Sequence, residues 1–499
     1  MSADQMSSWS FMPRSLAAYD VNLINGFVPL EEPIARLSDS YYKPWEDLAN
    51  EVVSLQMAGI YRQRALKLPV LSTHRLTNLR EYQRACVLLS FLSHAYIWGY
   101  NQQAEDTLPP CLAIPWCEVS RYVGISPIVT NATVVLWNWR LFEKNTTLDL
   151  SNLATQLTFT GTVDESWFYL VSTAIEAKSG EMMRSIGRMI NASISDDMQT
   201  AIDSLDQLTL TIKEVTRILG KMPERNDPYI FYWKTRRYLA GWENMKDAGL
   251  PNGIIYKDAK VYDPNGECNT PINSYVKFAG GSAAQSSTIQ IIDIALGVKH
   301  YPEDHGLSQD FTDTAKSSPN QFPQAPSNPF LMKMREYMPY SHRQFLIDLG
   351  NVCHFREYVL ASTRDVSSPS SEFSELIISN DSQGSSSLDL QKSLLKAYNR
   401  CVSTLKTFRD AHINIVKLYV VNQAKNPNTP ATNLLINPLR SPQMSSQKLI
   451  ASSTSVIKSP SVNGLAQAVA DDETVLGTGG TDAITFLQHL KDETVDTRL

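Results

Sequence analysis

The sequence lacks three features that would each assign the chain to a special class of protein. Its six cysteines are scattered through 499 residues and form no Cys-x-x-Cys pair and no zinc-type spacing, which favours reduced thiols. No apolar run approaches the about 20 residues that cross a bilayer, and the N-terminus carries no apolar signal segment. Lys and Arg number 45 against 51 Asp and Glu, with no basic block that could neutralise a run of phosphates. We therefore expect a cytoplasmic protein that binds neither a membrane nor nucleic acid.

What the chain does contain points to a large, mainly α-helical protein. Apolar residues make up 43% and charged residues 19%, enough to bury a substantial core. Because 499 residues exceed one usual core, we expect a smaller N-terminal domain of mixed or helical structure over 1–160 and a large all-helical domain over 161–499. Polar stretches rich in Ser, Pro and Asn at about 302–329, 366–387 and 426–470 are predicted to be surface insertions in the larger domain.

Apolar spacing, together with capping and first-turn residues, predicts five long helices. They span residues 78–98, 167–191, 197–219, 228–242 and 388–422. Pro228, at the start of the fourth, suits a first helical turn because its missing N–H needs no partner there. The segment 128–139 is rich in β-branched residues, and its pattern fits either a strand or a buried helix.

The helix predicted over 388–422 carries one long apolar face. Its positions step alternately by four and three residues: Leu394, Tyr398, Cys401, Leu405, Phe408, His412, Ile415 and Tyr419. All are apolar or amphipathic except His412. A histidine in such a stripe is either a core residue with a hydrogen-bonded ring or a neutral axial ligand to the iron of a non-covalent haem. The spacing alone leaves both interpretations open.

The other histidines narrow the choice of metal chemistry. They form no pair spaced i, i+4 along a helix, so a multi-histidine zinc or non-haem iron centre has little support. His94 lies in the apolar helix 78–98 and is the main competitor of His412. His300 stands at the edge of a polar loop, where we expect it to be solvated.

Several segments, taken together and in order, resemble the indoleamine 2,3-dioxygenase family, the haem enzymes that open the indole ring of L-tryptophan. The matching segments are SFLSHAYIWG (90–99), ESWFYLVSTAIEA (165–177), RRYLAGW (236–242), FAGGSAAQSSTIQIIDIALG (278–297), MREYMPYSHRQFL (334–346), FRDAHINIVKLY (408–419) and GTGGTD (477–482). The resemblance implies haem b as cofactor, L-tryptophan and O2 as substrates and N-formylkynurenine as product. It also implies a monomer acting at the first step of the kynurenine pathway, which leads toward NAD.

The resemblance implies a haem site built around His412, which matches the family's proximal ligand to the iron. Arg409, one turn earlier, is then expected beside the cofactor, on a propionate or on a carboxylate such as Asp293. On the other side of the haem, Phe168 and Ser172 match residues of the family's oxygen and indole pocket. Their i, i+4 spacing places both on one helix face.

Further matches concern the substrate. Phe231 matches an aromatic wall, and Arg236 matches the arginine that receives the substrate carboxylate through a two-pronged contact. These two residues stand five apart, about 140° round an ideal helix, so either the helix start is irregular or the helix is locally distorted. In the family, two more groups surround the indole: Gly281, Ser282 and Ala283 along the haem edge, and Thr478, Gly479 and Gly480 in a loop that closes on the substrate.

Two departures from the family leave alternative functions open. Where some relatives place an aromatic residue and a cysteine in the inner pocket, this chain has Asn131 and Val134, and its longest insertion lengthens the tether of the closing loop. One alternative is a haem protein that binds O2 or another indole without efficient tryptophan turnover, and another is a helical scaffold that has lost haem. Retention of His412 and Arg236 favours the dioxygenase.

Overall fold

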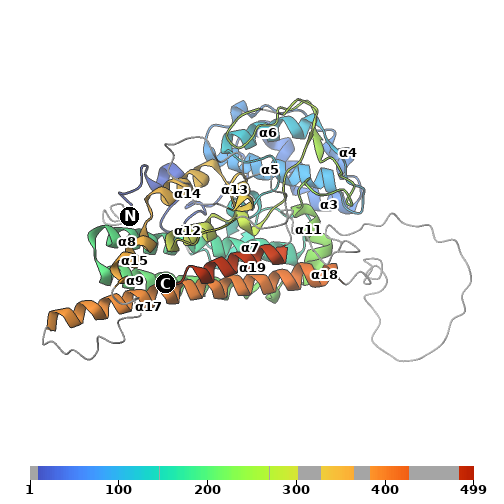
Figure 1. Cartoon of the computed structure of the whole chain (residues 1–499). Coiled ribbons are helices and arrows are strands. Elements are labelled where there is room, and N and C mark those ends of the chain that lie inside the picture. The colour runs from blue at the N-terminus through green and yellow to red at the C-terminus, as the bar shows by residue number, and fades with distance from the viewer. Residues whose placement is uncertain (1–8, 145–146, 269, 302–327, 365–381, 426–482) are drawn as a thin grey trace, which may run out of the picture.

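The computed structural model describes residues 9–144, 147–268, 270–301, 328–364, 382–425 and 483–499. Helices dominate these ranges, which confirms the predicted mainly α class (Figure 1). Helices α3 (Val52–Met57), α4 (Tyr61–Ala65), α5 (Leu79–Trp98) and α6 (Pro110–Val123) form one lobe in Figure 1, and the long helix α17 (Ser382–Val416) runs along the opposite edge. Helix α7 (Val163–Ala177) lies between the two.

The N-terminal part is built around α5 (Leu79–Trp98), a helix that is buried from Gln83 to its end. Its elements are η1 (Leu16–Tyr19), η2 (Ser40–Tyr42), α2 (Lys43–Asn50), α3 (Val52–Met57), α4 (Tyr61–Ala65), η3 (Thr73–Arg75), α5 (Leu79–Trp98) and α6 (Pro110–Val123). Helix α5 confirms the prediction over 78–98: the Asn78 side chain accepts a hydrogen bond from the Glu81 N–H at 3.1 Å, and the helix ends at Gly99. Every side chain from Gln83 to Trp98 is buried, so α5 is the centre of the first core.

Two small sheets join segments that are far apart in the sequence. Strand β1 (Thr107–Leu108) pairs in parallel with β4 (Ile254–Tyr256), which pairs antiparallel with β5 (Tyr275–Val276). Strand β2 (Trp139–Leu141) pairs antiparallel with β3 (Leu153–Thr155). The segment 128–139, left open between strand and helix, forms the buried π-helical turn η4 (Ala132–Leu136) and then enters β2.

From residue 163 onward the described chain is mainly helical, apart from residues 240–282, which contain β4 and β5. Its elements are α7, α8 (Ser179–Ser195), α9 (Met198–Leu219), η5 (Met222–Glu224), α10 (Pro228–Ile230), η6 (Phe231–Thr235), α11 (Arg236–Leu239), η7 (Ala283–Gln285), α12 (Ser287–Leu296), α13 (Pro329–Arg335), α14 (Tyr340–Val352), α15 (Phe355–Ser362), α17, η10 (Lys417–Val421), α18 (Asn422–Ala424) and α19 (Ala483–Asp496). Helix α9 confirms the prediction over 197–219, with the Asp197 carboxylate accepting from the Thr200 N–H at 2.9 Å.

Two of the predicted boundaries are wrong in this part of the chain. The single helix expected over 167–191 is two helices, because the N-terminal segment crosses it: the Ser179 hydroxyl accepts from the Phe27 N–H at 3.1 Å, and Gly180 abuts the Ile24 carbonyl. The insertion expected to 387 ends earlier, since α17 already begins at Ser382.

The buried apolar side chains form two main cores that meet at α7. The first surrounds α5 and α6 and also takes residues from 218–279, whereas the second joins α8, α9, α12, α14 and α17 to residues 9–27. Ile175 of α7 and Ile415 of α17 pack against both cores. Because the cores share chain segments in this way, the division into domains near residue 160 remains a proposal.

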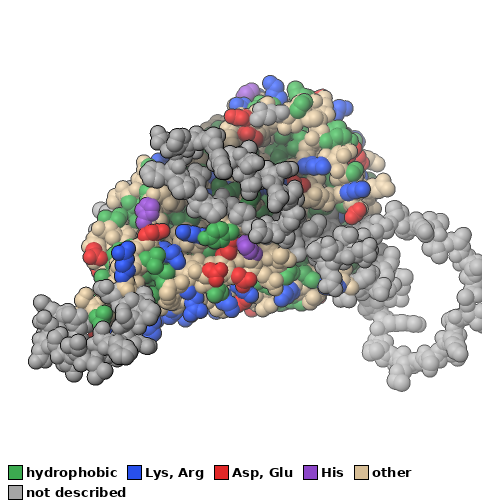
Figure 2. Space-filling model, viewed as in Figure 1, with side chains coloured by type: hydrophobic (Ala, Val, Ile, Leu, Met, Phe, Trp, Pro, Cys, Tyr) green, Lys and Arg blue, Asp and Glu red, His purple; other side chains and the backbone are tan. Residues whose placement is uncertain are grey.

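The outer face of α17 is strongly polar. Figure 2 shows Lys and Arg side chains interspersed with Asp and Glu along this edge of the molecule. Lys406 and Lys491 both reach Asp410, at 2.8 and 3.8 Å, so charges of opposite sign alternate there. Among the helices of the described ranges, none is long and apolar enough to cross a bilayer.

Candidate active site

A cavity of about 310 Å³ lies where the two cores meet, with walls from α7, η6, α11, α12, α17 and α19. Ten of the predicted site residues line it: Phe168, Ser172, Phe231, Arg236, Gly281, Ser282, Ala283, Asp293, Arg409 and His412. The other three, Thr478, Gly479 and Gly480, lie outside the described residues. Most of the remaining lining is apolar, which is typical of a small-molecule site.

His412 presents a neutral imidazole to this cavity. Burial lowers its pKa to about 4, and the positive charge of Arg409 acts in the same direction. The Phe408 ring lies roughly parallel to the imidazole, with centroids 6.4 Å apart. Within the described ranges, neither ring nitrogen of His412 has a hydrogen-bond partner in the protein. Such an imidazole is free to bind a metal ion that enters the cavity.

His94, the competing histidine, is a core residue. Its Nε2 accepts from the Val129 N–H at 2.9 Å, so its Nδ1 is the protonated nitrogen and donates to the Tyr238 carbonyl at 2.8 Å. Both ring nitrogens are therefore occupied. The His94 ring also lies tilted against the Trp242 ring, with centroids 4.6 Å apart, and burial lowers the pKa of His94 to about 3. Hydrogen bonding thus separates the two histidines that spacing could not.

Helix α7 contributes an aromatic and hydroxyl wall. The Phe168 ring lies 4.6 Å from the Phe231 ring, measured between centroids, and the two meet at the cavity surface. The Ser172 hydroxyl donates to the Phe168 carbonyl at 2.9 Å within the same helix. Because its proton is used there, the Ser172 oxygen can offer only its lone pairs to the cavity.

A π-helical turn brings Phe231 and Arg236 to the same cavity. The turn η6 begins at Phe231, and the Arg236 N–H donates to the Phe231 carbonyl five residues earlier. The local distortion that was one of two alternatives therefore accounts for their spacing. Arg236 is 2% exposed, and its guanidinium lies 5.4 Å from the Tyr232 ring centroid. The neighbouring Arg237 does not line the cavity and donates to the Gln102 carbonyl at 2.7 Å.

The helix predicted to end at residue 242 ends at Leu239, because the chain must pass tightly against a second loop. The Gly281 N–H donates to the Leu239 carbonyl at 2.9 Å, and the Trp242 N–H donates to the Phe278 carbonyl at 2.8 Å. These bonds fix the segment that carries Gly281, Ser282 and Ala283. Ser282 caps the following turn by accepting from the Ala284 N–H at 3.2 Å.

Gly241→Ala should destabilise this loop contact. A Cβ at Gly241 would lie 2.3 Å from the Phe278 carbonyl oxygen and 2.4 Å from the Gly280 nitrogen, so backbone would have to move. We expect a cost of about 1–3 kcal/mol, seen as a melting temperature lowered by a few degrees. Gly350→Ala is the control, since a Cβ there meets nothing within 4 Å. Equal melting temperatures for the two variants would contradict the close approach.

Glu176 is a cavity residue that the sequence analysis missed. It lies one turn after Ser172, is 3% exposed, and accepts from Asn131 Nδ2 at 3.2 Å and from Thr288 Oγ1 at 2.5 Å. Burial raises its pKa, and these donors partly oppose the shift. An acidic residue at i+4 from Ser172 in an otherwise apolar helix was the available signal. Asn131 and Val134 also line the cavity.

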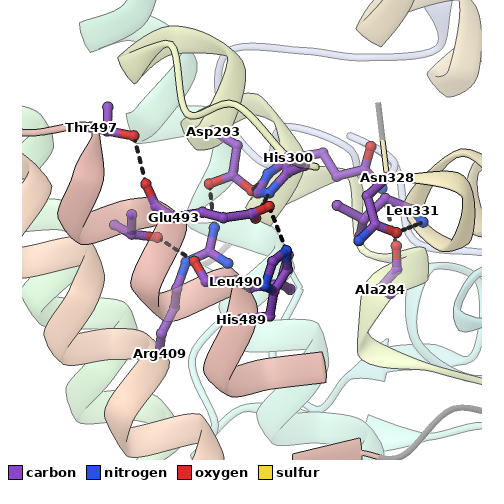
Figure 3. A network of polar contacts seen from close by, with 12 residues as sticks. Ala284, Asp293, His300, Asn328, Leu331, Arg409, His489, Leu490, Glu493 and Thr497 are labelled. Atoms are coloured by element: carbon purple, nitrogen blue, oxygen red, sulfur yellow. Dashed lines mark hydrogen bonds and ion pairs between the residues drawn. The ribbon is translucent and has the colours of Figure 1, made fainter. Parts of the chain in front are cut away.

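Arg409 and Asp293 form a buried ion pair beside the cavity (Figure 3). This is one of the two partners that the sequence offered for Arg409. His300 Nε2 lies 3.2 Å from the other Asp293 oxygen, so the expectation that His300 is solvated is wrong. Burial alone would raise the pKa of Asp293, but Arg409 and His300 outweigh it and hold the pKa low. Burial alone would lower the pKa of His300, but Asp293 and Glu493 raise it to about 9.

Comparison with known proteins places these residues in a family context. The family model described as indoleamine 2,3-dioxygenase matches residues 15–497. Indoleamine 2,3-dioxygenase of Saccharomyces cerevisiae is 35% identical over 492 residues, covering 97% of this chain and 93% of the relative. Indoleamine 2,3-dioxygenase nanC of Aspergillus nanangensis is 32% identical, covering 96% of both chains. The 6-hydroxytryptophan 2,3-dioxygenase fscD of Fusarium equiseti is 30% identical, again covering 96% of both.

Proposed function

Since the chain belongs to the indoleamine 2,3-dioxygenase family and is thus a dioxygenase, we propose that it converts L-tryptophan and O2 to N-formylkynurenine on a haem b held by His412. The observation that carries the proposal is the neutral His412 imidazole, which faces the same apolar cavity as the Arg236 guanidinium. One residue suits an iron ligand and the other suits the anchor of an amino-acid carboxylate.

The residues around His412 fit a haem group. His412 would supply the nitrogen ligand of a haem, the apolar lining would pack against its ring, and Arg409 would supply a cation for its propionates. The Nε atom of Arg409 is buried and has no hydrogen-bond partner among the described residues, so it can donate to an anionic group. When bound, haem supplies the redox chemistry that makes O2 reactive toward an indole.

The protein's own part in the reaction is binding, orientation and exclusion of water. Arg236 binds the substrate carboxylate, and the adjoining Phe168 and Phe231 rings form one aromatic wall against which the indole packs. The apolar lining keeps water from the reacting atoms. Both oxygen atoms of O2 enter the product as the indole C2–C3 bond is cleaved, so no separate leaving group has to be accommodated.

Turnover of L-tryptophan by the haem-loaded, reduced protein in air tests the proposal. N-formylkynurenine absorbs in the near ultraviolet, and we expect it to form much faster than with free haem at the same concentration. A normal haem spectrum without product would instead support a haem protein that binds O2 or another indole. The kynurenine pathway, with NAD as its end, a cytoplasmic location and a monomeric state also remain proposals.

A ring-hydroxylated tryptophan is the second candidate substrate, because Asn131 offers an acceptor to the cavity. An ionised Glu176 can only accept, so the Asn131 NH2 group must face it at 3.2 Å. This orientation leaves Asn131 Oδ1 able to accept a hydrogen bond from a ring hydroxyl. A relative named for 6-hydroxytryptophan covers 96% of this chain.

Asn131→Leu should separate the two substrates. We expect kcat/KM for 6-hydroxytryptophan to fall about tenfold, the value of one hydrogen bond, while kcat/KM for L-tryptophan changes less than about twofold. Tryptophan turnover by the same preparation serves as the control for haem content and folding. Equal losses on both substrates would mean that Asn131 shapes the cavity without recognising the hydroxyl.

A further inference from the structure

The C-terminal helix α19 forms one wall of the cavity that contains His412. Phe486, Leu487 and Leu490 line the cavity from this helix. The Phe486 ring packs edge-on against Phe330 of α13, with centroids 4.7 Å apart. Residues 426–482, between α18 and α19, lie outside the described residues, whereas the contacts of α19 with α13, with α17 and with the segment that follows α12 lie within them. These contacts hold the wall formed by α19 in place.

One buried ionic cluster ties α19 to the rest of the cavity (Figure 3). Glu493 of α19 is 6% exposed, and its Oε2 lies 2.6 Å from His300 Nδ1. Its Oε1 accepts from the Tyr301 N–H at 2.6 Å. The other ring nitrogen of His300 contacts Asp293, which pairs with Arg409. A continuous chain of charge-assisted contacts thus runs from Glu493 of α19, through His300 and Asp293, to Arg409 of α17.

The cluster is balanced in charge and sits next to the histidine of the cofactor site. Two buried carboxylates, Asp293 and Glu493, face two cations, Arg409 and protonated His300. Removing one partner of a buried pair is costly, because the other charge stays desolvated. Arg409 lies three residues before His412, on the neighbouring turn of α17. A change at Glu493 can therefore reach both the wall and the Arg409 side chain.

We propose that Glu493 and His300 are positioning residues for the cofactor: they clamp α19 against α12 and α17 and thereby slow the loss of haem from the cavity. The inference rests on the proposed function, since it requires that haem occupies this cavity. Neither residue touches the reacting atoms. Both act through Asp293 and Arg409 and through the wall formed by α19.

The rate of haem transfer to excess apomyoglobin tests the clamp. We expect Glu493→Gln and His300→Gln each to speed haem loss about tenfold, with the double variant no faster than the quicker single variant. Asp492→Asn is the matched control, because it makes the same acid-to-amide change one position earlier, where the side chain is 69% exposed. It should change the rate less than about twofold.

The pH profile of haem loss is a second readout, one that a merely structural role would not move. His300 contacts Asp293 of α12 and Glu493 of α19. Arg409 of α17 pairs with Asp293, His489 of α19 lies 2.9 Å from Glu493, and Arg335 of α13 lies beyond Asp293. His300 has a raised pKa of about 9, so the clamp holds at neutral pH and is lost as pH rises through 9. Protonated His300 also stabilises the folded state. This contribution is complete below pH 6.5, the pKa of the unfolded chain, and is lost as the pH rises from 6.5 to about 9. Haem loss should therefore accelerate above pH 8 in the wild type and stay flat in His300→Gln, which has no imidazole to titrate.

Two outcomes separate the clamp from the function on which it rests. A wild-type protein that takes up haem, with Glu493→Gln and Asp492→Asn losing it at the same rate, overturns the clamp alone. A wild-type protein that takes up no haem overturns the proposed function and the clamp with it. If Glu493→Gln proves too unstable to purify, His300→Gln gives the same comparison from the other side of the contact.

Discussion

His412→Ala is expected to abolish stable haem binding. The imidazole is the nitrogen base of the cavity that has no hydrogen-bond partner among the described residues, and burial keeps it neutral at any working pH. We expect haem affinity to fall at least about a hundredfold, or about 2.8 kcal/mol. Titration of the apoprotein with haem, followed by the visible absorption of the bound form, measures the loss.

Two comparisons make the His412→Ala result specific. His354→Ala removes an exposed imidazole elsewhere and should leave haem binding unchanged. Free imidazole fits the space left by the truncated side chain, so adding it to His412→Ala should restore part of the bound spectrum. Wild-type affinity in His412→Ala, without added imidazole, would assign the iron ligand to another residue.

The choice between His412 and His94 shows how far helical periodicity reaches. The stripe of α17 correctly places His412 on a buried face, and the same reasoning places His94 on one. The two histidines differ in their hydrogen bonds. The ring nitrogens of His94 bond the Val129 N–H, 35 residues away in the sequence, and the Tyr238 carbonyl, 144 residues away. Periodicity identifies a face of a helix but not the partners of that face. The resemblance to a family had to supply the choice.

Local helix geometry is a second feature of the site that the sequence could not predict. An ideal helix turns about 100° per residue, which separates Phe231 from Arg236, yet the π-turn η6 brings both to the cavity. No propensity rule predicts where such a turn occurs. The early end of α11 at Leu239 likewise depends on the Phe278 loop, which is remote in sequence.

Ion pairs between residues far apart in the sequence are a third feature that the sequence could not predict. His300 and Glu493 are 193 residues apart, and each is followed or preceded by polar sequence that suggests a solvated surface. Their contact depends on how α19 docks on α17, which no local pattern encodes. The Arg409–Asp293 pair could be predicted from the sequence, because a lone aspartate in the apolar run IQIIDIALG needs a buried cation.

Arg236→Leu is the second large expected effect, and it falls on the substrate. A carboxylate entering the cavity meets a guanidinium that is 2% exposed, where a two-pronged, charge-assisted contact is strong. We expect kcat/KM for L-tryptophan to fall about a hundredfold, or about 2.8 kcal/mol, mainly through KM, because the carboxylate is bound before and during the reaction alike. Haem affinity should stay near the wild-type value.

Two neighbouring changes show whether the loss comes from recognition of the carboxylate. Arg236→Lys keeps the charge but not the planar fork, so it should recover only part of the lost kcat/KM. Arg237→Leu removes the adjacent arginine, which bonds the Gln102 carbonyl and does not line the cavity, and should leave KM within about twofold of the wild type. Tryptamine, which lacks the carboxylate, provides a second test. We expect it to bind Arg236→Leu as tightly as it binds the wild type. If tryptamine binding falls as much as tryptophan binding, Arg236 supports the cavity wall and the carboxylate anchor lies elsewhere.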